Sequence, residues 1–183
     1  MLLDFLIPFI VIGLSELGDK TQLAILFLAS KTKQHLRLLL GVLLAFIIAD
    51  GLAIVFGDII TNIIPISYIK IGSGIIFIIF GIITLNNHKD DNEKYKTGSP
   101  FITGFTLILI SEMGDKSQIT AGLFAAQYNP WLVFFGVISA LFILSLIAVY
   151  IGKLFFKKIN TKTLSIIAGI MFIIIGIASF ISI

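Results

Sequence analysis

The chain has 183 residues, a formal net charge of +3 at pH 7 and 58% hydrophobic residues. Its mean hydropathy is +1.11, and its apolar share exceeds the roughly 45–50% that is typical of soluble domains. Because a soluble domain of this length cannot hide so much apolar surface, we expect an integral membrane protein with the lipid bilayer as its solvent. The chain contains no cysteine, which excludes disulfides and thiolate metal sites. Any metal site must therefore use oxygen ligands, since His35 and His88 fall in predicted loops.

Six segments satisfy the requirement of about 20 mostly apolar residues for a membrane-spanning helix. In chain order they are residues 4–30, 37–57, 66–85, 101–126, 130–152 and 162–182. The first and fourth are long and polar in the middle, so a tilt or a break is expected there. We predict an all-α integral membrane fold with a three-helix repeat at 1–85, a cytoplasmic linker at 86–100 and a second three-helix repeat at 101–183.

Basic residues lie almost entirely on one side of the predicted membrane. The loops after the first, third and fifth spans carry ten of them, whereas the opposite side carries only Lys70. The ten are Lys31, Lys33, Arg37, Lys89, Lys94, Lys96, Lys153, Lys157, Lys158 and Lys162. The positive-inside rule places these loops in the cytoplasm, so we predict a multi-pass protein of the cell membrane with both termini outside the cytoplasm. The same rule explains the pI of about 9.2 without a nucleic-acid partner.

Two sequence patterns occur once in each half of the chain. The polar octapeptide SELGDKTQ at 15–22 recurs as SEMGDKSQ at 111–118, and GIIFIIFGI at 74–82 matches GIMFIIIGI at 169–177. Each half has three spans, an odd number, so the second half must insert upside down relative to the first. We therefore predict two inverted three-helix repeats. Such repeats are typical of secondary transporters, whose substrate site lies near the bilayer midplane where the repeats meet.

The repeated octapeptide places charged residues in the middle of the first and fourth spans. These residues are Glu16, Asp19, Lys20, Glu112, Asp115 and Lys116. Within a continuous helix, spacings of three and four residues put each trio on one face. A charge at the bilayer centre costs at least about 2.5–3.5 kcal/mol, so all six need compensation. One alternative is purely structural: each glutamate pairs with the lysine of its own motif and holds the bundle together.

Pairing within the motifs leaves Asp19 and Asp115 without a counter-ion, and Asp50 in the second span adds a further acid. These five acids and two lysines have a formal charge of −3, most of which a divalent cation would offset. Hard divalent cations prefer carboxylate, carbonyl and hydroxyl oxygens. We therefore predict that Glu16, Asp19, Glu112 and Asp115 bind a divalent metal ion. Neutral oxygens close by belong to Ser15, Thr21, Gln22, Ser111, Ser117 and Gln118.

Three further positions allow two interpretations each. Asp50 has no acidic counterpart in the second half, where the matching residue is Ser145. It either carries the coupling proton or ties the spans together through hydrogen bonds. Gly18 and Gly114 either permit close helix packing or open the backbone so that a carbonyl faces the ion. We favour close packing for both glycines.

Two copies of the signature Glu-x-Gly-Asp-(Lys/Arg)-(Thr/Ser), at 16–21 and 112–117, match at every defined position. Lying in the first and fourth of six short spans, they resemble the cation/proton exchanger family that includes the Golgi and chloroplast manganese/calcium transporters. The short chain, rich in isoleucine and lysine, resembles a bacterial member. The resemblance implies transport of Mn²⁺ and/or Ca²⁺ against protons and, for a bacterial member, manganese export. It points to Glu16, Asp19, Lys20, Thr21, Glu112, Asp115, Lys116 and Ser117.

The predicted mechanism is alternating access. The four carboxylates bind the cation when the site is open to the cytoplasm, and protons from outside displace it. Supporting or coupling roles fall to Lys20, Thr21, Gln22, Asp50, Lys116, Ser117 and Gln118. A passive cation channel is the main alternative. A membrane enzyme is disfavoured because the sequence shows no nucleophile–base constellation, and a non-transporting scaffold does not explain the buried acids. We expect no resident cofactor. The preference between Mn²⁺ and Ca²⁺, the stoichiometry, the direction and the oligomeric state stay open.

Overall fold

The computed structural model of the chain describes residues 1–86, 99–151 and 161–181. These residues form helices joined by short turns, with no strand among them, which confirms the all-α prediction for this part of the chain. In chain order the helices are α1 (Leu2–Glu16), α2 (Lys20–Lys31), α3 (His35–Ile60), α4 (Ile66–Asn86), α5 (Pro100–Glu112), α6 (Lys116–Ala125), α7 (Pro130–Leu146), the π-helical η1 (Ile147–Ile151) and α9 (Thr161–Ile181). Most of the linker predicted at 86–100 lies outside the described residues.

Three of the described helices are long and apolar enough to cross a membrane, namely His35–Ile60, Ile66–Ile83 and Pro130–Ile151. They correspond to the second, third and fifth predicted spans. Shorter apolar helices fall within the first, fourth and sixth predicted spans, namely Thr21–Lys31, Pro100–Glu112 and Gly169–Ile181. Large apolar side chains such as Phe56 and Trp131 are exposed on the outside of the bundle, as lipid contact requires. The chain is therefore a multi-pass membrane protein.

The first and fourth predicted spans are each broken at the repeated motif. Residues 17–19, here the first hinge, separate α1 from α2, and residues 113–115, the second hinge, separate α5 from α6. The backbone φ is +83° at Gly18 and +81° at Gly114, a conformation that glycine adopts readily and other residues rarely. A Cβ added at Gly114 would meet nothing within 4 Å. Our preference for close packing is therefore wrong for Gly114, because the chain uses this glycine to turn the backbone, and Gly18 has the same backbone conformation.

The hinges also change how the motif residues are arranged. Glu16 is the last residue of α1, Asp19 lies in the first hinge and Lys20 begins α2. The prediction that these three residues share one face of a continuous helix is therefore wrong, and the same holds for the second motif. Each hinge instead lets an acidic side chain leave the helical repeat and turn toward the other half of the chain.

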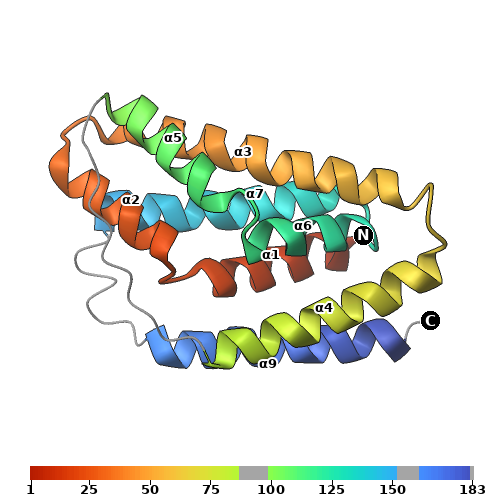
Figure 1. Cartoon of the computed structure of the whole chain (residues 1–183). Helices are drawn as coiled ribbons and strands as arrows, with labels where there is room; N and C mark the ends of the chain where they lie inside the picture. The colour runs from red at the N-terminus through yellow and green to blue at the C-terminus, as the bar shows by residue number, and fades with distance from the viewer. Residues whose placement is uncertain (87–98, 152–160, 182–183) are drawn as a thin grey trace.

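The most closely packed helix pairs each combine one helix of the first half with one of the second (Figure 1). The most extensive contacts join α4 with α9, α3 with α5, and α1 with α7. In the α3–α5 contact, Gly41 lies directly against the backbone carbonyl of Phe101, and in the α1–α7 contact Gly136 lies directly against that of Phe5. A side chain at either glycine would clash with backbone, so both contacts depend on a missing Cβ. Both contacts therefore use a glycine of one half against a phenylalanine of the other.

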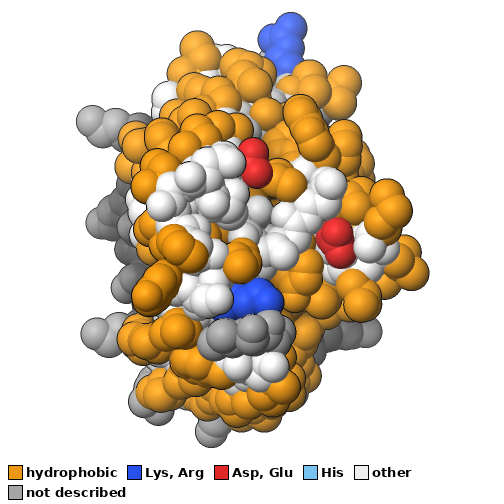
Figure 2. All heavy atoms as spheres, turned by 90° about the vertical axis from the view of Figure 1, so that its right-hand side faces the viewer, with side chains coloured by type: hydrophobic (Ala, Val, Ile, Leu, Met, Phe, Trp, Pro, Cys, Tyr) orange, Lys and Arg blue, Asp and Glu red, His pale blue; other side chains and the backbone are white. Residues whose placement is uncertain are grey.

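Corresponding helices of the two halves run in opposite directions. α1 runs away from the end where the N-terminus lies, whereas α5 and α6 run toward it (Figure 1). α3 and α7 are likewise antiparallel, and α1 begins at the same end of the bundle at which α9 finishes (Figure 1). The face at this end is mainly hydrophobic and carries only a few charged side chains (Figure 2). The two hinges lie between the two ends of the bundle (Figure 1), and Met113 of the second hinge is exposed.

Candidate metal-binding site

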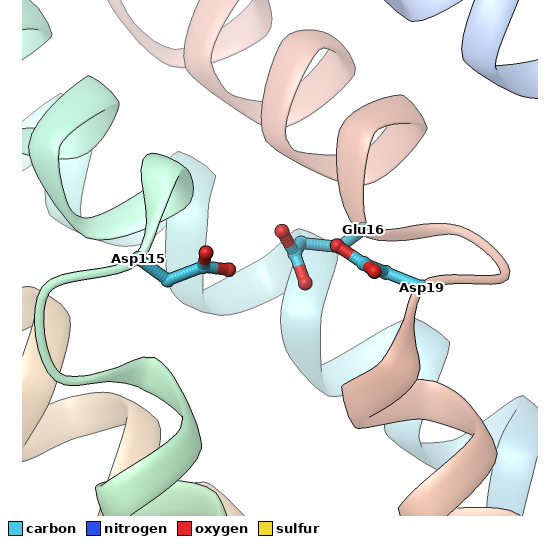
Figure 3. A group of neighbouring side chains, drawn as sticks. All are labelled: Glu16, Asp19 and Asp115. Carbon is cyan, nitrogen blue, oxygen red and sulfur yellow. The ribbon is translucent and has the colours of Figure 1, made fainter. Parts of the chain in front are cut away.

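Three acidic side chains converge at the two hinges, one of them fully buried and two partly buried. Ligand oxygens of Glu16, Asp19 and Asp115 all lie within 4.8 Å of one another. Glu16 ends α1, Asp19 lies in the first hinge, and Asp115 points toward them from the second hinge (Figure 3). A cation with metal–oxygen distances of about 2.1–2.6 Å contacts oxygens up to roughly 5 Å apart. The separations in this acidic cluster are therefore those that a single hard cation can bridge.

Glu16 differs from the other two acids in its burial. Its side chain is fully buried, and neither carboxylate oxygen has a hydrogen-bond partner among the described residues. Burial of a polar group without a partner is costly, and burial of an uncompensated charge is more so. Glu16 is therefore poised to accept a proton or a cation, the two partners that would remove this cost.

A lysine of the second half contacts an aspartate of the first. Lys116 Nζ donates to Asp19 Oδ2 at 2.7 Å, and both side chains are about one-quarter exposed, at 26% and 25%. The structural alternative predicted that each glutamate pairs with the lysine of its own motif. In the second motif the lysine instead pairs with an aspartate of the first motif. The side chain of Lys20, the corresponding residue of the first motif, lies outside the described part of the structure.

Glu112 is buried like Glu16 but has hydrogen-bond donors. Thr21 Oγ1 donates to Glu112 Oε1 at 2.8 Å, and Ser117 Oγ donates to Glu112 Oε2 at 3.0 Å. Thr21 belongs to the first half of the chain and Ser117 to the second. Although Glu112 was predicted as a metal ligand, its two oxygens are engaged by hydroxyl groups here, and it is not one of the three converging acids.

The two glutamines of the motif also differ. Gln118 accepts from the Gly114 amide at 2.7 Å and donates to the Ala49 carbonyl at 2.9 Å, so it connects the second hinge to α3. Gln22 is fully buried, and neither atom of its amide group has a partner among the described residues. Gln118 is thus a structural brace in this conformation, whereas Gln22 has unused hydrogen-bonding capacity.

Asp50 lies in α3 next to the residue that Gln118 contacts. It is fully buried, neither carboxylate oxygen has a partner in the part of the chain that the structure describes, and Glu112 and Asp115 are close enough to repel its charge. Ser145, the matching residue of α7, is also buried with an unpartnered hydroxyl. The interpretation of Asp50 as a hydrogen-bonded tie between spans therefore finds no partner within the described residues.

Sequence reasoning did not single out two buried hydroxyls. Thr120 in α6 and Ser73 in α4 are each about 1% exposed or less, with no hydrogen-bond partner among the described residues. Thr120 follows Ser117 by three residues, so helical periodicity could have placed it on the same face of α6. Ser15, predicted as an oxygen donor near the site, instead donates to the Ile12 carbonyl at 3.1 Å.

Known proteins resemble this chain along nearly its whole length. The model of the family described as Divalent cation/proton antiporter GDT1 matches residues 4–92 and 100–183. A Vibrio cholerae serotype O1 protein, provisionally named a manganese exporter, is 28% identical over 171 residues, which are 92% of this chain and 86% of that protein. The Synechocystis GDT1-like protein sll0615 is 28% identical over 202 residues, with 98% and 97% covered.

A plant relative shows the same extent of similarity. The rice GDT1-like protein 5 (Oryza sativa subsp. japonica) is 27% identical over 210 residues, which span 92% of this chain and 90% of that protein. No solved structure matches the chain significantly. The family consists of transporters rather than enzymes, as was predicted for this chain. The chain belongs to the GDT1 family of divalent cation/proton antiporters.

Proposed function

We propose that this protein exports Mn²⁺ and/or Ca²⁺ from the cytoplasm in exchange for protons, and that the acidic cluster of the two hinges binds the transported ion. The observation that carries the proposal is the convergence of Glu16, Asp19 and Asp115, whose ligand oxygens lie within 4.8 Å of one another. A single acidic residue in a membrane protein can simply hold helices together through hydrogen bonds. Three acids from two halves of a chain, with one carboxylate lacking any described partner, suit a cation that comes and goes.

The ligand chemistry supports a hard divalent cation. All the candidate ligands are oxygen atoms, which Ca²⁺, Mg²⁺ and Mn²⁺ prefer over the softer transition metals. Manganese is favoured as one substrate because a relative in Vibrio cholerae is provisionally named a manganese exporter. Calcium accepts the same oxygens, so Mn²⁺ and Ca²⁺ are both proposed substrates.

The architecture suits alternating access. We infer that the six predicted spans form two inverted repeats, with α1, α3 and α4 corresponding to α5, α7 and α9. This inference is supported by the antiparallel directions of the corresponding helices (Figure 1) and by the repeated glycine–phenylalanine contacts of α3–α5 and α1–α7. Transporters of this kind place broken helices at a central site and rock one repeat against the other. The two hinges are broken helices of this type.

Protons and lysine supply the counter-charges when the metal is absent. Carboxylates must lose their protons to bind a metal, so protons and divalent cations compete for the acidic cluster. We propose that Lys116, which contacts Asp19 at 2.7 Å, acts as an internal counter-ion in the metal-free state. Asp50, buried near Glu112 and Asp115, is proposed to carry a coupling proton.

The proposed direction of transport combines the predicted topology with a proton gradient directed into the cell. The positive-inside rule puts the basic loops in the cytoplasm and the termini outside. The common end of α1 and α9 (Figure 1) is compatible with termini on one side, and the proposal assigns that side to the exterior of the cell membrane. Protons flowing inward would then drive the divalent cation outward.

A proteoliposome assay separates exchange from passive conduction. Mn²⁺ and Ca²⁺ fluxes are measured with and without an imposed pH gradient for the native chain, Glu16→Gln and Asp115→Asn, with the exposed Asp58→Asn as the control. Exchange predicts flux that follows the pH gradient and is lost in both variants of the acidic cluster but not in the control. Flux that ignores the pH gradient would support a channel instead, and absence of flux from well-folded native protein would contradict transport.

A further inference from the structure

The two glutamates of the repeated motif are chemically equivalent in sequence but not in structure. Glu112 receives a hydroxyl hydrogen bond on each carboxylate oxygen, from Thr21 at 2.8 Å and from Ser117 at 3.0 Å. Glu16 is equally buried and receives none from the described residues. Because the two motifs share the same residue types at these positions, the difference must come from conformation rather than from composition.

The internal repeat relates the two donors to each other. Thr21 matches Ser117 and Glu16 matches Glu112, both at an offset of 96 residues. If each residue is replaced by its counterpart in the other half, the same two hydroxyls donate to Glu16 instead of Glu112. A hydroxyl has one hydrogen to donate, so Thr21 and Ser117 cannot serve both glutamates at once. The two arrangements are mutually exclusive.

The same replacement of residues by their counterparts changes one member of the acidic cluster. The observed cluster contains Glu16, Asp19 and Asp115. With each residue replaced by its counterpart, the cluster consists of Glu112, Asp115 and Asp19. The two aspartates are common to both clusters, and only the glutamate changes. The glutamate that the hydroxyls release is thus the one that can join the aspartates.

The glutamines carry the same asymmetry independently. Gln118 braces the second hinge through the Gly114 amide and the Ala49 carbonyl, whereas the buried Gln22 has no partner among the described residues. Both the hydroxyl pair and the glutamine brace therefore engage the second motif and leave the first open. Two separate sets of contacts that differ in the same sense indicate one of two related states.

We propose that Thr21 and Ser117 form a shared donor pair that selects which glutamate is free to bind the cation. In the present state the pair holds Glu112 and frees Glu16, and in the opposite state it holds Glu16 and frees Glu112. The two aspartates keep contact with the ion while the glutamates exchange. This inference rests on the proposed exchange function, within which Thr21 and Ser117 are positioning residues rather than ligands.

Removal of both hydroxyls separates positioning from ligation. The variant Thr21→Val/Ser117→Ala is compared with Thr21→Ser and Ser117→Thr, which keep the hydroxyls, and with Thr106→Val, whose lost hydroxyl bonds only its own helix. Two quantities are measured on the full chain: the equilibrium affinity for Mn²⁺ and the pH-driven Mn²⁺ exchange rate. The shared pair predicts that the double variant keeps or raises its Mn²⁺ affinity while its exchange rate falls at least about tenfold, the size of a lost hydrogen bond to a charged group.

The hydroxyl-retaining variants should rescue exchange. Unchanged exchange in the double variant would overturn the proposal, as would a parallel loss of affinity and exchange, which would make the hydroxyls ligands or structural groups. If the native chain shows no pH-driven exchange, the proposed function fails. A measurement that does not need transport then decides on the donor pair.

That second measurement is hydrogen–deuterium exchange at the two hinges. The hydroxyls should prefer an ionised carboxylate over a neutral amide, so Glu16→Gln should keep them on Glu112 and Glu112→Gln should move them to Glu16. The proposal expects stronger amide protection around Gly114 than around Gly18 in the first variant, and the reverse in the second. Equal protection of the two hinges in both variants would overturn it.

Discussion

Lys116 Nζ lies 2.7 Å from Asp19 Oδ2, so the cation of one motif neutralises an acid of the other across 97 residues of sequence. Asp19 is also one of the three acids that converge at the hinges. The ammonium group therefore stands beside the place where a metal ion would share the same carboxylate. Occupation by the metal and contact with Lys116 should oppose each other.

This opposition predicts the effect of removing the ammonium. In Lys116→Met we expect Mn²⁺ to bind at least about fivefold more tightly, because a like charge about 4 Å away costs roughly 1–4 kcal/mol. The exchange rate should fall, since the metal-free site loses its counter-ion. Isothermal titration of Mn²⁺ and proteoliposome exchange measure the two effects, with Lys116→Arg as the charge-retaining control. Weaker Mn²⁺ binding by well-folded Lys116→Met would contradict the role of counter-ion.

The hinge glycines allow a second prediction. Gly114→Ala should destabilise the protein by about 1–3 kcal/mol, because its φ of +81° strains any residue with a Cβ. No neighbour lies within 4 Å of an added Cβ, so the loss would come from the backbone alone. Gly72→Ala in α4 is the matched control, since it also has open space but no positive φ. It should be neutral or slightly stabilising. Thermal unfolding in detergent compares them, and equal stability of both variants would be inconsistent with a strained hinge.

Asp50 provides a test of proton coupling. Asp50→Asn keeps the size of this buried side chain but cannot take up and release a proton. We expect it to bind Mn²⁺ with about native affinity, because Asp50 is not among the converging acids, while its exchange no longer responds to the pH gradient. Proteoliposome flux at several imposed gradients gives the answer. A native response of Asp50→Asn to the gradient would assign the coupling proton elsewhere.

Metal affinity should depend on pH in a defined sense. Protonated carboxylates cannot bind a metal, so Mn²⁺ binding should weaken as the pH falls, by about tenfold per pH unit for each proton that the ion displaces. At a pH high enough to leave the cluster fully ionised, the affinity should level off. Titrations of Mn²⁺ at a series of pH values measure this slope. An affinity that does not change with pH would argue against competition between protons and the ion.

Much of the helical layout was predictable from sequence. The hydropathy segments at 37–57 and 66–85 closely match α3 and α4, because a continuous apolar run of that length has no other stable structure in lipid. The break in the first span was also foreseen as one of two possibilities. The conformation of Gly18 and Gly114 was not, because a glycine in an apolar segment suits both a tight contact and a turn. Only the backbone geometry distinguishes the two.

The site was predictable in composition but not in arrangement. The acids of the two motifs were singled out, and the structure brings Glu16, Asp19 and Asp115 together. Two nearly identical motifs cannot reveal that Thr21 donates to Glu112 rather than to Glu16. That choice belongs to one conformational state of an internally repeated chain. The sequence is the same in every state and therefore does not indicate which glutamate is bonded. For the same reason, the pairing of Lys116 with Asp19 instead of Glu112 could not be anticipated.

The central claim is that the acids of the two hinges bind one divalent cation together. Equilibrium titration of Mn²⁺ into the native chain, Asp19→Asn and Asp115→Asn tests it most directly, with Asp58→Asn as the control outside the hinges. We predict one Mn²⁺ per chain and a loss of at least about tenfold in affinity for each hinge variant, since each removes a charged ligand. The control should stay close to native. Native affinity in either hinge variant would contradict a site shared by the two halves.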